Sequence, residues 1–162
     1  LVELVKEVPD FKSHLEIKLI GAVSQEVLDA IQEHQLNDYL NLVGYVSHKE
    51  AVAHQRKSQV LLLIEINSED TKSIIPGKLF EYLASNQAIL AIGPKTGDSA
   101  HILQEQSNTL VIDFDEKPTW EAIQTLTSGV INRTDTLSKY SRQELAKEMS
   151  AFLNELMLKS SK

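Results

Sequence analysis

Apolar and polar residues form short blocks along this chain, some with the three-to-four spacing of a helix and others with the tight runs of a strand. Apolar residues at helical spacing predict helices, and short apolar runs bounded by glycine or proline predict strands. Strands are therefore expected over residues 15–20, 41–43, 59–64, 88–92 and 109–112. Helices are expected over residues 1–9 with a stop at Pro9, and over residues 27–36, 47 onward, 76–84, 98–104, 118–131 and 141 onward.

The order of these elements predicts the fold class. Two runs, Val60–Ile64 and Ala88–Ile92, are apolar without alternation, which is typical of central strands that are buried on both faces. Helices that alternate with such strands predict an α/β fold: a Rossmann-like parallel sheet with helices on both faces and right-handed connections. This fold places Gly44, Gly77 and Gly93 near one edge of the sheet.

Two helix starts have the form of a capping box, in which a hydroxyl and a carboxylate each accept a hydrogen bond from the other residue's backbone amide. Ser47 with Glu50 and Ser141 with Glu144 have the required spacing. The helix after Ser141 carries an apolar face that is expected to point inward and consists of Leu145, Met149, Phe152, Leu153 and Leu156.

Composition narrows the function. The chain has 162 residues, of which 42% are hydrophobic and 24% charged, so we expect one domain over residues 1–162. A net charge of −7 without a basic run argues against nucleic-acid binding. No apolar stretch approaches the roughly 20 residues of a membrane span. The chain has no cysteine, which excludes disulfides and thiolate chemistry. Because its first residues already have helical spacing, we expect upstream sequence, including the first strand, to be missing from this chain.

Ligands of open parallel sheets bind at the carboxyl ends of the strands. Four strands here end in residues that allow close backbone approach, namely Gly21, Gly44, the loop 65–77 and Gly93. The usual nucleotide fingerprints are absent. The turn after Gly21 lacks the second and third glycines of a dinucleotide site, and Gly77-Lys78 lacks both the first glycine and the following Ser or Thr of a phosphate loop.

The segment Ile75–Ala84 is the strongest candidate for a binding site. A helix that begins at Pro76-Gly77 directs free amides and the positive end of its dipole at an anion, and Lys78 adds a full charge. Glu81 lies one turn further on the same face, where a carboxylate can accept the hydroxyls of a ribose. A solvated Lys78–Glu81 ion pair explains the same spacing equally well.

The sequence Pro-Gly-Lys-Leu-Phe-Glu-Tyr-Leu-Ala over residues 76–84, followed by Ala-Ile-Leu-Ala at 88–91, resembles the donor-binding motif of retaining GT-B glycosyltransferases. Weaker matches are Leu-Ile-Gly at 19–21, Val-Gly-Tyr-Val at 43–46 and Tyr-Ser-Arg at 140–142. The resemblance covers nearly the whole chain, as the C-terminal, donor-binding half of a GT-B fold of the group 1 or family 4 type.

The resemblance implies roles for particular residues. The helix start, with Gly77, Lys78 and Leu79, would bind the diphosphate of a nucleotide-sugar, and Glu81 would bind its ribose. The loop at Tyr45 and Val46 would border the base. Ser73 stands on the sugar side, where many members of the family carry a glutamate eight positions before the second one.

The resemblance also implies an activity: transfer of a sugar from a nucleoside diphosphate to an acceptor, with retention, in polysaccharide biosynthesis. No metal cofactor is expected, the partners are the donor and the protein's own N-terminal acceptor domain, and the setting is cytoplasmic with at most peripheral contact to the inner membrane face. Catalytic residues remain unassigned, and this chain alone is expected to be inactive. The alternative is a non-catalytic, nucleotide- or ligand-binding module of Rossmann-like or flavodoxin-like form.

The remaining polar residues give weaker signals. The five histidines, at positions 14, 34, 48, 54 and 101, have no ligand spacing. Glu69 and Asp70 have no third carboxylate with which to hold a metal, and neither Ser73 nor Thr71 has a positioned base.

Overall fold

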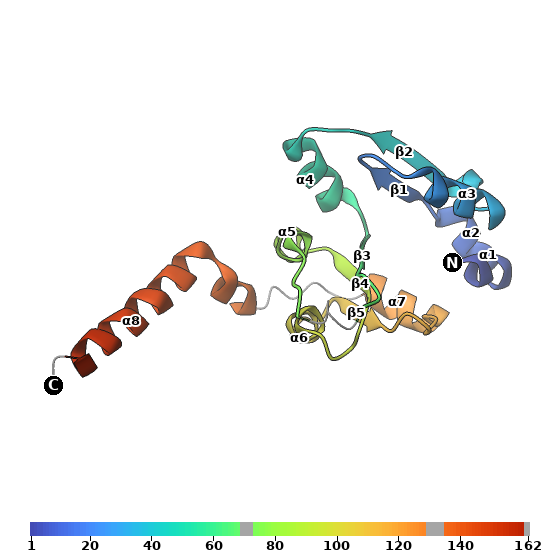
Figure 1. Ribbon diagram of the computed structural model, residues 1–162. Helices are drawn as coiled ribbons and strands as arrows, with labels where there is room; N and C mark the ends of the chain where they lie inside the picture. Colours follow the sequence, from blue (N-terminus) through green and yellow to red (C-terminus); the bar gives the residue numbers. More distant parts are fainter. Residues whose placement is uncertain (69–72, 129–134, 161–162) are drawn as a thin grey trace.

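The computed structural model describes residues 1–68, 73–128 and 135–160 (Figure 1). Its parallel strands are β1 (Ile17–Ile20), β2 (Leu40–Gly44), β3 (Val60–Ile64), β4 (Ala88–Ile92) and β5 (Thr109–Ile112). Its helices are α1 (Val2–Glu7), α2 (Pro9–His14), α3 (Gln25–Glu33), α4 (His48–Lys57), α5 (Gly77–Ser85), α6 (Asp98–Gln104), α7 (Trp120–Ser128) and α8 (Arg142–Ser160), with short 3₁₀ helices η1 (Asn37–Tyr39) and η3 (Asp135–Tyr140). The predicted α/β, Rossmann-like class is confirmed.

The strands form two separate parallel sheets. β1 pairs with β2, and β4 lies between β3 and β5 in a second sheet of three strands. The sequence predicted one sheet with Val60–Ile64 near its centre. The parallel pairing of β3 and β4 is confirmed, with Val60 opposite Ala88. The central position is confirmed only for β4, because β3 has no strand beside its other edge among the residues that the structure describes.

The core fills one face of the three-stranded sheet. Side chains from β3 and β4 pack there against α5 and α6, and the buried cluster consists of Leu61, Leu63, Leu79, Leu83, Ile89, Ala91 and Leu103. α7 contacts the other face at β4 and β5, and its Leu126 is buried. Helices therefore cover both faces of this sheet, as predicted.

The prediction that Val60–Ile64 is buried on both faces is wrong. Leu61 and Leu63 are buried, but Leu62 and Ile64 are 47% and 63% exposed. The cause is the position of α7, which packs on β4 and β5 and leaves the second face of β3 without a covering helix in the described part of the chain.

The first helix stops before Pro9, as expected: α1 ends at Glu7, with Val8 as its C-cap. The sequence did not predict that Pro9 begins a second helix, α2, where the first position needs no N–H donor. Both helices contact α7, or the segment just before it, in the three-stranded sheet. The Phe11 and Trp120 rings meet edge to face with their centroids 5.4 Å apart, and Lys117 Nζ lies 2.5 Å from Glu3 Oε1. Contacts between α1–α2 and the α7 segment thus join the two sheets.

The two predicted capping boxes have different outcomes. At Ser47 the box is complete, with Glu50 N–H donating to the hydroxyl and Ser47 N–H donating to the carboxylate. At Ser141 the hydroxyl accepts from Glu144 N–H at 3.2 Å, but Ser141 N–H donates to the Ser138 carbonyl at 2.9 Å instead of to a carboxylate. The second box is therefore only half formed.

The inward orientation predicted for the last helix is wrong. α8 runs away from the rest of the molecule (Figure 1), and its apolar residues are exposed: Leu145, Met149, Phe152, Leu153, Leu156, Met157 and Leu158. Its base is anchored through η3. Lys139 Nζ lies 2.5 Å from Glu105 Oε2, and the Tyr140 ring lies 5.5 Å from that of Phe80 on α5.

Two expectations concern residues outside the described ranges. The candidate residues Glu69, Asp70 and Thr71 are among these residues, and so is the end of the helix predicted over 118–131. That helix, α7, begins at Trp120 rather than at Pro118. Within residues 1–68, 73–128 and 135–160, no helix is both long and apolar enough to cross a membrane.

Candidate functional site

The carboxyl ends of β3, β4 and β5 converge at one edge of their sheet. Backbone hydrogen bonds join neighbouring strands just beyond their last residues. Glu65 N–H donates to the Ile92 carbonyl at 2.9 Å, and Gly93 N–H donates to the Ile112 carbonyl at 3.0 Å. The Ser99 hydroxyl on α6 donates to the Ile74 carbonyl at 3.3 Å, which ties α6 to the segment leading into α5. The N-termini of both helices are thus positioned at this edge.

A side chain at the end of β4 would crowd the neighbouring strand. A Cβ on Gly93 would lie 2.9 Å from Glu65 Oε2 and 3.1 Å from Glu65 Cβ, because the glutamate side chain folds across this position. Gly93 therefore permits close approach as predicted, but the group that approaches it here is a side chain of the neighbouring strand.

A hollow of about 200 Å³ lies between the loops that follow the three strands. Its walls are Asn67 and Ser68 after β3, Pro94, Lys95 and Thr96 after β4, and Asp113 and Phe114 after β5. Sequence analysis did not select Lys95, Asp113 or Phe114. Their position just beyond two strand ends was the available signal, but nothing in the residues themselves suggested a ligand.

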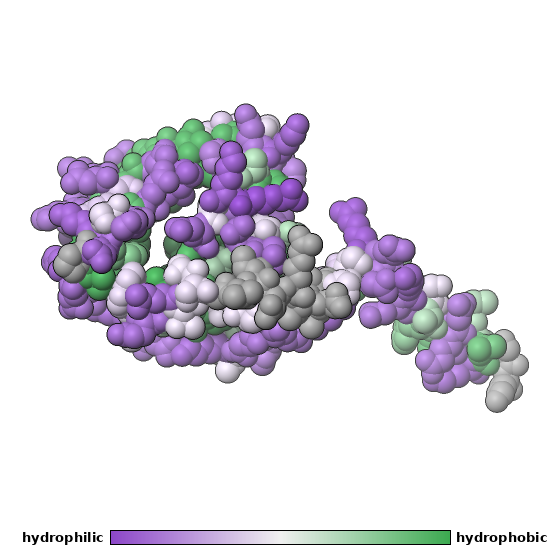
Figure 2. Space-filling model, turned by 180° about the vertical axis from the view of Figure 1, so that it is seen from behind, coloured by the Kyte–Doolittle hydropathy of each residue, from purple (hydrophilic) through white to green (hydrophobic). Residues whose placement is uncertain are grey.

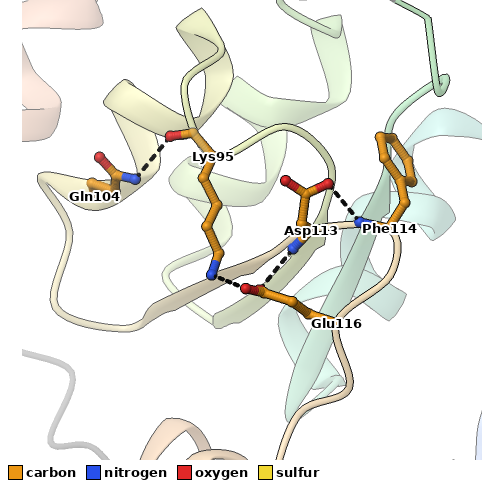
Figure 3. Close-up of polar contacts among 5 residues, drawn as sticks. All are labelled: Lys95, Gln104, Asp113, Phe114 and Glu116. Atoms are coloured by element: carbon orange, nitrogen blue, oxygen red, sulfur yellow. Dashed lines mark hydrogen bonds and ion pairs between the residues drawn. The ribbon is translucent and has the colours of Figure 1, made fainter.

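The lysine at this hollow is already paired with a carboxylate, and Asp113 adds a further negative charge (Figure 3). Lys95 Nζ lies 2.5 Å from Glu116 Oε1, and Asp113 N–H donates to Glu116 Oε2 at 3.0 Å. These hydrogen bonds, first from Lys95 and then from the Asp113 backbone, lower the pKa of Glu116. Asp113 in turn accepts from Phe114 N–H at 2.8 Å. With its lysine paired, the hollow offers a polar surface and little net attraction for an anion.

The start of α5 differs from the hollow, because its amides lack a capping side chain. Pro76 is the N-cap, with φ −63° and ψ 135°, and it makes no side-chain cap hydrogen bond. Leu79 N–H donates to the Pro76 carbonyl at 2.9 Å, and the Leu79 side chain is 0% exposed in the core. Among the residues that the structure describes, no group accepts a hydrogen bond from the amides of Gly77 and Lys78, and a Cβ added at Gly77 would meet nothing within 4 Å.

Lys78 and Glu81 lie on α5 and both are exposed. Among the described side chains no ion pair joins them. Instead, Gln55 Nε2 on α4 donates to Glu81 Oε2 at 3.2 Å. Gln55, which sequence analysis missed, thus donates to one carboxylate oxygen, and no described residue donates to Oε1. Gln55 and Glu81 are 26 positions apart in the sequence, so no local pattern of residues predicts their hydrogen bond.

The other predicted site residues lie on neighbouring segments. Gly44 ends β2 with φ +77°, a left-handed value that favours glycine, and its carbonyl accepts from Gly21 N–H at 2.7 Å. Tyr45 follows it and is 94% exposed, and Val46 is half-buried ahead of α4. Ser73 is exposed in the segment before α5. The structure therefore places Gly77, Lys78, Leu79 and Glu81 on one helix, with the Tyr45–Val46 loop leading into the helix that contacts Glu81.

Metal ligation has no candidate in the described part of the chain, where no three or more His, Asp or Glu side chains gather. The exposed His14 ring lies 2.9 Å from the Ser13 hydroxyl.

Comparison with known proteins adds no relative: no family model and no curated protein matches this chain.

Proposed function

We propose that this chain is the nucleotide-sugar-binding domain of a retaining GT-B glycosyltransferase. The observation that carries the proposal is the start of α5, where the amides of Gly77 and Lys78, which have no acceptor among the described residues, stand one turn before the exposed carboxylate of Glu81. Amides at a helix start bind phosphate, and a carboxylate one turn away accepts the hydroxyls of the attached ribose.

In the proposed reaction the sugar leaves a nucleoside diphosphate and is transferred to an acceptor with retention. Negative charge develops on the departing diphosphate, and preorganised donors lower the barrier most where such charge appears. The amides of Gly77 and Lys78 and the Lys78 ammonium would supply that stabilisation without a metal. The base would lie by Tyr45 and Val46, and the sugar by Ser73.

The acceptor would be held by another domain of the full-length enzyme. Transfer requires donor and acceptor in aligned contact, and closure between domains excludes water. This chain alone is therefore expected to bind nucleoside diphosphates weakly, at about 10–1,000 µM or roughly 4–7 kcal/mol, and not to turn over. The alternative function is a non-catalytic, nucleotide- or ligand-binding module of the same form, because a fold by itself does not fix a function.

Calorimetry with UDP, GDP and ADP, each against its nucleoside, tests the proposal. We expect the diphosphates to bind more tightly than the nucleosides and equally well in EDTA. Lys78→Ala should weaken the diphosphate more than the nucleoside, whereas Lys12→Ala on α2 serves as the control. The absence of binding at millimolar concentrations would favour the alternative, and enzyme-like turnover by this chain alone would contradict the proposed division between domains.

A further inference from the structure

Glu65 adds a carboxylate to the core face of the three-stranded sheet. Side chains alternate between the two faces of a strand, so residues 61, 63 and 65 share one face. Leu61 and Leu63 lie on that face in the buried cluster, together with residues of α5 and α6. The other face of β3 is exposed at Leu62 and Ile64, and Figure 2 shows hydrophobic residues on the walls of the opening that runs through the body. Glu65 therefore belongs to the face that α5 and α6 cover.

The same face of β4 ends at Gly93, and the Glu65 side chain lies over this glycine. Ile89 and Ala91 are buried in the cluster, and Gly93 follows them with the same spacing of two. A Cβ on Gly93 would lie 2.9 Å from Glu65 Oε2 and 3.0 Å from Glu65 Cδ. A carboxylate thus occupies the place that a side chain of β4 would fill, directly beyond the last core residues.

This carboxylate is half-buried, and no group among the residues that the structure describes donates a hydrogen bond to it. Lys95, two positions after Gly93, is bonded to Glu116 instead. A charge that has lost part of its hydration without gaining a partner favours a ligand that brings hydrogen-bond donors. Hydroxyl groups can supply such donors, whereas a phosphate repels the carboxylate because both are negative.

The start of α5 lies at the same end of the core as Glu65. Leu79 of α5 and Leu63 of β3 belong to one buried cluster. Gly77 precedes Leu79 by two positions, and Glu65 follows Leu63 by two positions. A helix that joins two parallel strands runs back against them, so its first turn stands at the carboxyl ends of the strands. A diphosphate bound at the start of α5 therefore has its attached groups at the end of the core where the carboxylate stands.

We propose that Glu65 makes this site prefer an intact nucleotide-sugar to the nucleoside diphosphate that remains after transfer; this inference rests on the proposed function. In the donor, hydroxyls of the sugar donate to the carboxylate, and hydrogen bonds to a charged acceptor are roughly twice as strong as neutral ones. Once the sugar has left, the carboxylate lacks donors again and repels the diphosphate. Glu65 therefore favours both binding of the donor and release of the product.

Calorimetry with Glu65→Gln tests the inference, because the amide keeps the shape of the side chain over Gly93 and removes its charge. The probes are UDP-glucose, GDP-mannose and ADP-glucose, each compared with its free diphosphate. In the unaltered chain we expect at least one sugar nucleotide to bind about tenfold more tightly than its diphosphate. In Glu65→Gln this ratio should fall to about one, while the free diphosphate should bind about threefold more tightly. The control is Glu121→Gln in the first turn of α7, which should leave the ratio unchanged.

The outcomes separate this inference from the proposed function. Diphosphates that bind, with the same ratio in Glu65→Gln as in the unaltered chain, would overturn the inference alone. A ratio of about one for all three probes in the unaltered chain would do the same. No binding of any diphosphate would overturn both the inference and the proposed function.

A second measurement uses the unaltered chain, so it does not depend on how the variant folds. The probes are forms of the preferred sugar nucleotide that lack each sugar hydroxyl in turn. We expect the loss of at least one hydroxyl to weaken binding by about tenfold, to the level of the free diphosphate. Equal affinities for all of these forms would overturn the inference, since the sugar hydroxyls would then make no bond to a charged group.

Discussion

Removal of the Glu81 carboxylate is the sharpest test of the nucleotide site. Glu81 is exposed, and its carboxylate accepts a hydrogen bond from Gln55 Nε2 at 3.2 Å. Exposed substitutions of this kind change stability by no more than about 0.5 kcal/mol, so Glu81→Ala should fold normally. Any loss of affinity then reports on the ligand rather than on the fold.

The expected size of the loss follows from the hydrogen bonds that the carboxylate would make. Hydrogen bonds to a charged group contribute about 1.5–3 kcal/mol. We therefore expect Glu81→Ala to raise the dissociation constant of the nucleotide by about ten- to 150-fold. Gln55→Ala leaves the carboxylate in place and removes only the hydrogen bond to its Oε2. We therefore expect the nucleotide affinity to fall by only about twofold.

A ligand lacking one ribose hydroxyl completes the test. Calorimetry should show that the 2′-deoxy nucleoside diphosphate binds more weakly than the ribose form to the unaltered chain, and that this difference disappears in Glu81→Ala. Glu121→Ala, an exposed glutamate in the first turn of α7, is the control. Unchanged affinity in a folded Glu81→Ala protein would refute the ribose role, as would a 2′-hydroxyl preference that survives the substitution.

The remaining predictions concern stability and titration. Leu79→Ala removes a side chain that is 0% exposed and should lower the free energy of unfolding by about 2–5 kcal/mol in urea denaturation, whereas a loss below 1 kcal/mol would contradict its place in the core. Gly93→Ala should lower the free energy of unfolding by about 1 kcal/mol, because Glu65 Oε2 at 2.9 Å can swing away whereas Glu65 Cβ at 3.1 Å must shift, and Glu65→Ala in the same chain should restore part of that loss. The pKa of Glu116 is lowered by the hydrogen bond from Lys95, so its contribution to stability is present above the ordinary glutamate pKa and is lost as the pH falls through the lowered one. NMR titration should show this pKa rising toward its ordinary value in Lys95→Gln, and an unmoved pKa would exclude Lys95 as the main cause.

Features that depend on neighbouring residues in the sequence could be predicted here, and features that depend on distant packing could not. The Ser47 capping box follows from two residues three positions apart and is complete in the structure. The parallel pairing of β3 with β4 follows from the order of elements. The exposure of Leu62 was not predictable, because it depends on where α7 packs and on what stands beside β3.

The same distinction applies to the candidate site. The N-terminus of α5 is encoded by Pro76-Gly77 and was found from the sequence. The hollow beside Lys95 exists only because three strand ends meet, and the hydrogen bond from Gln55 to Glu81 only because α4 lies beside α5. Neither arrangement leaves a pattern in one segment of the chain.

The exposed helix α8 has a mechanical consequence. Its 19 residues extend about 28 Å from a base held by η3, so a rotation of about 10° at the base moves the far end by about 5 Å. Through Tyr140 that base touches Phe80, the residue next to Glu81. A large displacement of the α8 tip therefore corresponds to only a small rotation at its base, the part of the helix that lies beside α5.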